Sequence, residues 1–163
     1  YGINSYKKIY CYEITPSTIS ILKKNLSKYN NILFKEKACS NFIGNSYITE
    51  NTESSSANKV GDSQNGNISI SVTTIDEDIK EKISIIKMDI EGDEQKALDG
   101  GKKHIINDSP LLLISIYHSN YDLFEIPNKI HEMNPNYNFY LRYYGGYIYP
   151  TEIILVAIPK VKK

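Results

Sequence analysis

Two hydrophobic periods alternate along this sequence, and the alternation restricts the chain to folds in which strands and helices follow one another. Residues 8–13 (KIYCYE) predict a short strand that ends on an acid. A helix follows, with Thr15 at its N-cap, Pro16 at its first position and Asn30–Asn31 at its end. Its apolar stripe is Ile19, Leu22, Leu26 and Tyr29. Residues 32–38 predict the next strand, which completes a βαβ unit.

The same alternation returns in the second half of the chain. Residues 83–89 predict a strand, and the acidic run 91–94 predicts the start of a helix, because acidic groups in the first turn complement the helix dipole. The apolar stripe of that helix is Ala97, Leu98, Gly101 and Ile105. Residues 111–117 are almost wholly apolar, which is typical of a strand covered on both faces.

The end of the chain predicts one more helix and two strands. The helix covers residues 122–133 and either starts near Pro127 or is kinked there. The strands cover residues 137–144 and 153–158, and a turn at Gly145–Gly146 allows them to form a hairpin. We therefore expect an α/β fold built on one mostly parallel sheet with a C-terminal antiparallel hairpin.

The length of 163 residues predicts a single domain, residues 1–163. Within it, residues 51–67 contain many Ser, Asn and Gly residues and only one bulky aliphatic residue, Val60, which predicts a flexible loop. Short strands are expected on either side of this loop, at 45–50 and 68–74, either as a hairpin or as an excursion from the main sheet.

Charge and cysteine content argue against several classes of function. The 19 basic and 19 acidic side chains cancel, so neither nucleic acid nor an anionic membrane is an expected partner. No apolar run approaches the roughly 20 residues of a membrane-spanning helix. Cys11 and Cys39 are too few for a disulfide framework or for a zinc site of their own. We expect a soluble, cytoplasmic protein and make no prediction of its oligomeric state.

Open α/β sheets bind ligands beyond the carboxyl ends of their strands, and this rule selects the candidate site residues. They are Glu13, Ala38, Asp89, Glu91 and His118. Glu13 is placed to accept hydrogen bonds from the two hydroxyls of a ribose, and the alternative is an exposed acid near a helix N-terminus. Neither of the common glycine-rich phosphate loops occurs in the sequence.

Three of these residues carry side chains suited to proton transfer. Asp89 and Glu91 are close enough in sequence to poise a general base or to hold a hard divalent cation, and the alternative is an acidic first helical turn. His118 follows the apolar strand, where an imidazole can accept a proton from a hydroxyl, and the alternative is a capping or surface residue. His104 and His131 fall within predicted helices, and we assign them no role.

Aromatic residues are frequent in the final hairpin, namely Tyr137, Phe139, Tyr140, Tyr143, Tyr144, Tyr147 and Tyr149. They predict either a wall on which a sugar or ring stacks or, in our preferred interpretation, two strands packed with β-favouring side chains. Arg142 is the only arginine in the sequence, and its planar guanidinium suits bidentate binding of an anion.

Residues 84–101 (SIIKMDIEGDEQKALDGG) resemble the strand–acid–helix signature of the FkbM family of S-adenosylmethionine-dependent methyltransferases. Residues 111–130 (LLLISIYHSNYDLFEIPNKI) and 140–146 (YLRYYGG) are similar to later segments of that family. Residues 9–26 (IYCYEITPSTISILKKNL) are similar to its ribose-binding strand and the helix that follows. The resemblance extends over most of the chain and is interrupted by residues 51–67.

This resemblance implies a class I methyltransferase-like (Rossmann-like) fold with a seven-stranded sheet, and S-adenosylmethionine as cofactor. It implies that Glu13 holds the ribose hydroxyls of the cofactor and that Ala38 and Cys39 lie near the adenine. It implies that Asp89 lies beside the methionine end.

On the acceptor side, the resemblance implies Glu91 and His118, which together with Asp89 are the candidates for a catalytic base. The implied reaction is O-methylation of a hydroxyl on a sugar, glycan, polyketide or other small molecule. We assign no metal ligand among these residues.

The first strand of the family and its glycine-rich loop would precede Tyr1, so we expect this chain to be part of a longer bacterial enzyme and to be weakly active or inactive alone. Two other functions stay open. One is a catalytically silent methyltransferase-like domain that binds a protein or glycan. The other is a nucleotide-sugar enzyme that uses a metal held by Asp89 and Glu91.

Overall fold

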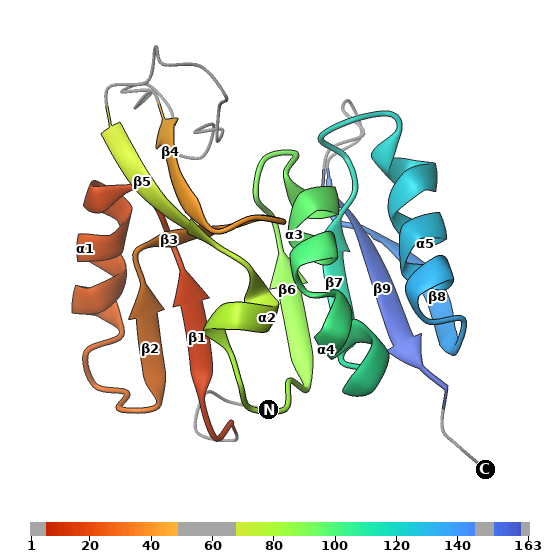
Figure 1. The fold of residues 1–163 in the computed structure, drawn as a ribbon, viewed down its shortest axis with the longest axis horizontal. Helices are drawn as coiled ribbons and strands as arrows, with labels where there is room; N and C mark the ends of the chain where they lie inside the picture. Colours follow the sequence, from red (N-terminus) through yellow and green to blue (C-terminus); the bar gives the residue numbers. More distant parts are fainter. Residues whose placement is uncertain (1–5, 49–67, 146–151, 161–163) are drawn as a thin grey trace. The chain divides into compact units, whose positions relative to one another are not determined.

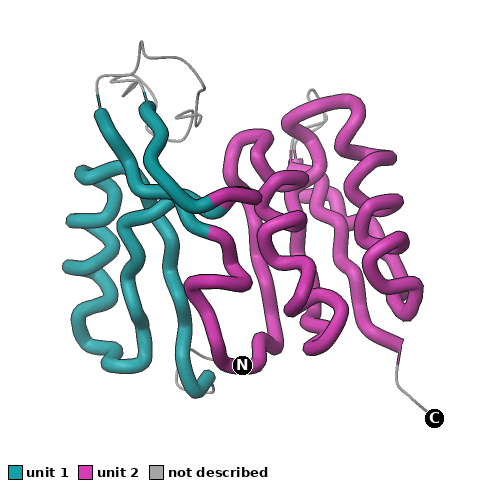
Figure 2. The backbone as a smooth tube through the Cα atoms, viewed as in Figure 1, with its two compact units in different colours: residues 1–39, 43–73 teal, residues 40–42, 74–163 magenta. Residues whose placement is uncertain are grey.

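A computed structural model describes residues 6–48, 68–145 and 152–160 of the chain (Figure 1). The chain divides into two compact units, coloured separately in Figure 2: unit 1 contains residues 1–39 and 43–73, and unit 2 contains residues 40–42 and 74–163. The loop predicted at 51–67 lies outside the described residues. Each unit is described by itself below.

The first part of unit 1 is a βαβ unit, as predicted. Strands β1 (Ile9–Tyr12) and β2 (Ile32–Lys35) pair in parallel. Helix α1 (Pro16–Asn25) connects them and has proline in its first turn, where the missing N–H costs no hydrogen bond. The helix is shorter than predicted, because it ends about one turn before Asn30–Asn31.

The second sheet of unit 1 has the strand order β3-β5-β4. Strand β5 (Ile68–Thr73) is parallel to β3 (Lys37–Cys39) and antiparallel to β4 (Gly44–Ile48). The antiparallel pair confirms the strands expected on either side of the predicted loop. Buried residues of this three-stranded sheet form a core cluster, and Ile14 and Ile68 pack against it. The members of the cluster are Ala38, Ile48, Ile70 and Val72.

The prediction of one continuous strand over residues 32–38 is wrong. β2 and β3 are separate strands in different sheets, and the break falls at Glu36. The Glu36 carboxylate is exposed and pairs with the Lys23 ammonium of α1 at 2.5 Å. Apolar periodicity could not reveal this change of sheet, because the side chains before and after Glu36 are all suited to strands.

Unit 2 contains a four-stranded sheet with the order β6-β7-β9-β8. Strand β6 (Ile85–Met88) is parallel to β7 (Leu111–Ser115), and both β7 and β8 (Tyr137–Tyr143) are antiparallel to β9 (Ile153–Pro159). The β8–β9 pair confirms the expected C-terminal antiparallel strands. The single, mostly parallel sheet is not confirmed, because the described strands form three sheets and two of these are mixed.

Three helices of unit 2, α3 (Glu94–Gly100), α4 (Lys102–Asn107) and α5 (Asp122–Met133), lie on one face of this sheet (Figure 1). Helix α5 runs through Pro127 and buries Ile126 and Ile130, so it does not start near Pro127. The single helix predicted after the acidic run is instead two short ones, α3 and α4. No helix in the described part of the chain is both long and apolar enough to cross a membrane.

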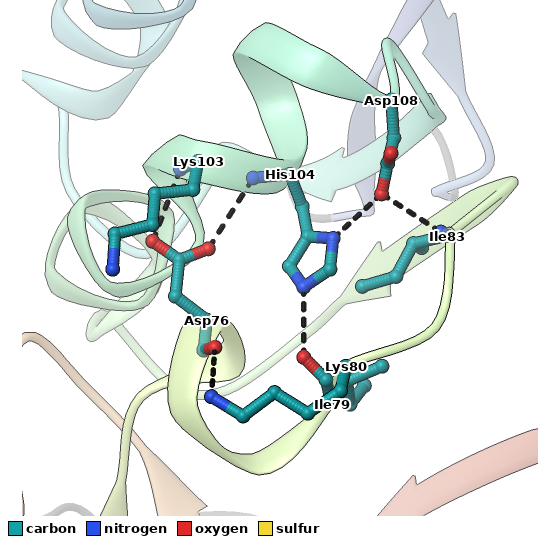
Figure 3. A network of polar contacts seen from close by, with 7 residues as sticks. All are labelled: Asp76, Ile79, Lys80, Ile83, Lys103, His104 and Asp108. Atoms are coloured by element: carbon teal, nitrogen blue, oxygen red, sulfur yellow. Dashed lines mark hydrogen bonds and ion pairs between the residues drawn. The ribbon is translucent and has the colours of Figure 1, made fainter.

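A polar network ties α4 to a short helix that we did not predict, α2 (Ile75–Asp78) (Figure 3). The Asp76 carboxylate accepts hydrogen bonds from the backbone N–H groups of Lys103, at 3.0 Å, and His104, at 3.3 Å. The sequence signal for α2 is a capping-box spacing. Thr74 is the N-cap, and its hydroxyl accepts a hydrogen bond from the N–H of Glu77.

The aromatic residues of the last two strands have different environments. Tyr137 is buried, its hydroxyl donates a hydrogen bond to the carbonyl of Pro110, and burial raises its pKa to about 12. Its ring stacks on that of Phe139. Tyr140, Tyr143 and Tyr144 are exposed. Tyr147 and Tyr149 lie outside the described residues.

Candidate functional site

A tight turn at the carboxyl end of β6 presents two of the predicted acids. Asp89 directly follows the strand, and Glu91 and Gly92 both have positive φ angles, of 60° and 103°. Glycine adopts such a conformation freely, whereas a positive φ raises the conformational energy of a residue that has a Cβ. Residues held in this way are concentrated at active sites, so the backbone of Glu91 is a reason to consider a function for its carboxylate.

The buried carboxylate of Glu94 holds this turn in place. Its side chain is fully buried at the start of α3. One carboxylate oxygen accepts a hydrogen bond from the N–H of Ile90 at 2.8 Å, and the other accepts one from the N–H of Gly92 at 3.0 Å. Because both oxygens are bonded to the turn, the position of Glu94 is fixed by the same backbone that carries Asp89 and Glu91.

His118 comes from the end of β7 and lies against these three carboxyl groups. Its Nδ1 atom is 3.1 Å from Glu94 Oε1, and its Nε2 atom is 3.5 Å from Asp89 Oδ1 and 3.7 Å from Glu91 Oε2. The side chain is only 7% exposed. Neither ring nitrogen has a hydrogen bond of acceptable geometry to any residue that the structure describes.

Tyr117 adds a hydroxyl to the group. This hydroxyl donates a hydrogen bond to Asp89 Oδ1 at 3.2 Å, and the Tyr117 and His118 rings are 4.3 Å apart. Burial, followed by the neighbouring carboxylate of Asp89, raises the pKa of Tyr117. The phenol therefore stays protonated at neutral pH and serves as a donor rather than as a base.

The structure thus brings together the three site residues predicted in unit 2, Asp89, Glu91 and His118. Asp89 and Glu91 are the accessible members, with side chains 35% and 29% exposed. Such a group of carboxylates around an imidazole can accept a proton. Asp89, Glu94 and His118 also have ligand atoms that all lie within 4.8 Å of one another, a spacing that suits a metal ion.

The remaining predicted residues belong to unit 1. Glu13 follows β1, and its Oε1 atom accepts hydrogen bonds from the N–H groups of Ile14, at 2.7 Å, and Thr15, at 2.8 Å. One of its carboxylate oxygens is therefore engaged at the start of α1. The Ala38 side chain lies in the core cluster of unit 1, so only its backbone is left to face a ligand. Cys39 is half-buried at the end of β3.

Sequence reasoning missed the roles of Glu94 and Tyr117 in this group. Glu94 was identified only as a first-turn acid, since nothing in its spacing shows that its side chain turns inward toward the backbone. Unit 1 also has a hollow at the amino ends of β1 and β2 that contains none of the predicted site residues. It is lined by Tyr6, Lys7, Lys8, Asn30, Asn31 and Leu33.

Known proteins match this chain in sequence pattern and in fold. The family model of the Methyltransferase FkbM domain matches residues 4–145. The crystal structure of methyltransferase FkbM from Methylobacillus flagellatus KT is similar over 93% of this chain, with a TM-score of 0.70 and 23% sequence identity. This chain spans 36% of that protein, about a third of its length. Among curated proteins, none matches this sequence.

Proposed function

Because the chain belongs to the Methyltransferase FkbM domain family, we propose that it takes part in S-adenosylmethionine-dependent O-methylation of a hydroxyl on a sugar, a glycan or another small molecule. The observation that supports this proposal best is the group of Asp89, Glu91 and His118 at the carboxyl ends of β6 and β7. Ligands of open α/β sheets bind beyond this edge, and removing a proton from a hydroxyl needs a base there.

The proposed reaction is an in-line displacement at the methyl group of the sulfonium cofactor. The acceptor oxygen forms a bond to the methyl carbon while the carbon–sulfur bond breaks, and the bonding electrons stay on sulfur. The products are a methyl ether, S-adenosylhomocysteine and a proton. The protein contributes by orienting the two substrates and by accepting the proton of the hydroxyl.

Glu91 is the proposed base. A base must come within hydrogen-bond distance of the hydroxyl, and the Glu91 side chain is 29% exposed whereas that of His118 is 7% exposed. Glu91 has a left-handed backbone in the turn, and its carboxylate is partly exposed. In this arrangement His118 acts as a positioning residue behind the two accessible carboxylates.

In unit 1, Glu13 remains the proposed ligand of the cofactor ribose, with the backbone at Ala38 and Cys39 near the adenine. Ile14, which follows Glu13, packs against the core cluster that contains Ala38, so the ends of β1 and β3 lie close together within this unit. Asp89 is the proposed neighbour of the methionine end of the cofactor.

Incubating the protein with radiolabelled S-adenosylmethionine and a panel of hydroxyl acceptors tests this function. Because this chain alone is expected to be weakly active at most, we expect slow transfer of label to the acceptor, and we expect Glu91→Gln to lower kcat by about 10²-fold or more, the usual effect of removing a general base. Cofactor affinity should stay within about twofold, because Glu91 faces the acceptor. Glu125→Gln, which removes an exposed acid of α5, is the matched control and should change neither value.

Calorimetric titration with the cofactor tests the ribose assignment separately. Glu13→Gln keeps an acceptor for the N–H groups of Ile14 and Thr15 but removes the charge, so it should weaken binding while the protein stays folded. Glu36→Gln, at an exposed acid of the same unit, should not. Cofactor binding without transfer to any acceptor would favour the silent binding domain. Absence of cofactor binding in the wild-type protein would contradict the methyltransferase proposal.

A further inference from the structure

The His118 imidazole is a buried polar group whose nitrogens make no hydrogen bond to any residue that the structure describes. Both ring nitrogens are shielded from solvent, and neither makes a hydrogen bond of acceptable geometry within the described part of the chain. Buried polar atoms nearly always have a partner, since leaving one unpaired costs about 1–3 kcal/mol. A bound ion is one of the few arrangements that explain such an atom.

The atoms that face this imidazole are carboxylate oxygens, which are common ligands of divalent cations. The side chains of Asp89, Glu94 and His118 each offer one ligand atom, and these three atoms lie within 4.8 Å of one another. Two ligands bound to one metal at about 2.1 Å are at most about 4.2 Å apart. Atoms as much as 4.8 Å apart would therefore have to approach by about 0.6 Å or more, and the exposed Asp89 side chain is the one that can move to close the site.

The two carboxylates are already oriented by groups outside the site. Both Glu94 oxygens accept backbone hydrogen bonds, from Ile90 and Gly92, and Asp89 accepts one from the Tyr117 hydroxyl. Outer hydrogen bonds of this kind hold the ligands of metal sites in position and contribute to their affinity. Glu91 adds a third acidic group 3.7 Å from the imidazole, so acidic groups outnumber the basic one.

We propose that Asp89, Glu94 and His118 form a binding site for a divalent transition-metal cation. One imidazole nitrogen with carboxylate oxygens is a donor set that suits zinc or manganese, whereas magnesium and calcium prefer oxygen ligands alone. The cation would lie beside Glu91, at the carboxyl ends of β6 and β7. The site is defined by the geometry of unit 2 and does not depend on the reaction proposed above.

Titration of the metal-stripped protein with Zn²⁺, and separately with Mn²⁺, tests the site in the absence of cofactor and acceptor. We expect one tight site for each probe. His118→Asn should weaken it by about tenfold or more, since even outer residues of metal sites contribute about 10–100-fold. His131→Asn, at an exposed histidine of α5, is the matched control and should leave the affinity unchanged.

Two further measurements keep the proposal open to refutation if His118→Asn does not fold. Asp89→Asn changes an accessible side chain and should also weaken binding about tenfold or more. Imidazole ¹⁵N spectra should show one His118 nitrogen shifting when Zn²⁺ is added. Equal Zn²⁺ affinity in the wild-type protein and in these variants, or an unshifted His118 signal at saturating Zn²⁺, would overturn the proposal. Either result would leave the methyltransferase proposal unaffected.

Discussion

At the scale of single residues, both ring nitrogens of His104 have a hydrogen-bonding partner within the protein. Nδ1 lies 2.6 Å from Asp108 Oδ2 and Nε2 lies 3.0 Å from the carbonyl oxygen of Ile79 (Figure 3). Both partners are acceptors, so both nitrogens donate only when the ring carries two protons. His104 therefore stabilises the fold, in contrast to His118, whose ring nitrogens have no such partners among the described residues.

The same contacts predict how stability depends on pH. Burial raises the pKa of Asp108, but the hydrogen bonds from His104 and from the N–H of Ile83 outweigh it, so the pKa is lowered from 3.8. The folded state then binds fewer protons at this site than the unfolded chain does. The stability that results is complete above pH 3.8 and is lost as the pH falls through the lower folded value.

Asp108→Asn should lower the free energy of unfolding at pH 7 by about 1–2 kcal/mol, since it removes a charge-assisted hydrogen bond. It should also flatten the acid limb of the stability curve. Asp99→Asn removes an exposed partner of Lys129 and should cost less than about 1 kcal/mol. Urea denaturation between pH 2.5 and pH 7 measures both effects. An acid limb as steep in Asp108→Asn as in the wild type would contradict the assignment.

At the scale of elements, the last residue of α3 lies very close to the backbone of a segment that is distant in the sequence. A Cβ atom added to Gly100 would lie 2.0 Å from the backbone oxygen of Ser40, and residue 40 is itself buried. Alanine is the better helix former by about 1 kcal/mol, but a clash with backbone cannot be relieved by turning a side chain. We therefore expect the clash at Gly100 to outweigh the helix propensity of alanine, so that the substitution lowers the stability of the protein.

We expect Gly100→Ala to destabilise the protein by about 1–3 kcal/mol. Gly101→Ala is the matched control, because the tightest contact of its Cβ would be with the flexible end of Ile75, at 3.2 Å, and the nearest backbone atom would be 3.5 Å away. We expect that variant to change stability by less than about 1 kcal/mol. Chemical denaturation of both variants provides the comparison. Equal stabilities would contradict the close approach of Gly100 to the Ser40 backbone.

Much of the element order was predictable from the sequence, whereas the pairing of the strands was not. The strands at residues 85–88 and 111–115 have strong apolar runs, and helix α5 has a clear stripe, so each was found close to its observed bounds. Periodicity did not reveal that β2 and β3 separate at Glu36 and join different sheets, or that the helix is interrupted at Gly101.

The candidate site was partly predictable for the same reason. The ends of β6 and β7 were recognisable, and parallel neighbours bring their carboxyl ends to the same edge, so the approach of His118 to Asp89 and Glu91 could be expected. The burial of Glu94 could not, because an acid in the first turn of a helix is usually solvated. Its inward orientation depends on the left-handed turn at Glu91 and Gly92.

At the scale of the whole molecule, charge balance and one sheet edge together predict self-association. The formal net charge is zero and the sequence pI is about 7.0, so electrostatic repulsion between copies is weakest near pH 7. Strand β8 is at the edge of the described sheet of unit 2 and exposes apolar side chains. In β8, Leu141 and Tyr143 are 60% and 53% exposed, and Tyr144, directly after the strand, is 69% exposed.

Leu141→Lys should therefore raise the protein concentration at which turbidity appears at pH 7, because a lysine on an edge strand opposes pairing with another chain. Ile21→Lys is the matched control: Ile21 is 59% exposed on helix α1, and the substitution adds the same charge on a helix instead of an edge strand. A larger increase in this concentration for Leu141→Lys than for Ile21→Lys would show that the association involves the edge of β8. Equal increases for the two variants would show that the association depends on net charge alone and would contradict a role for the strand edge.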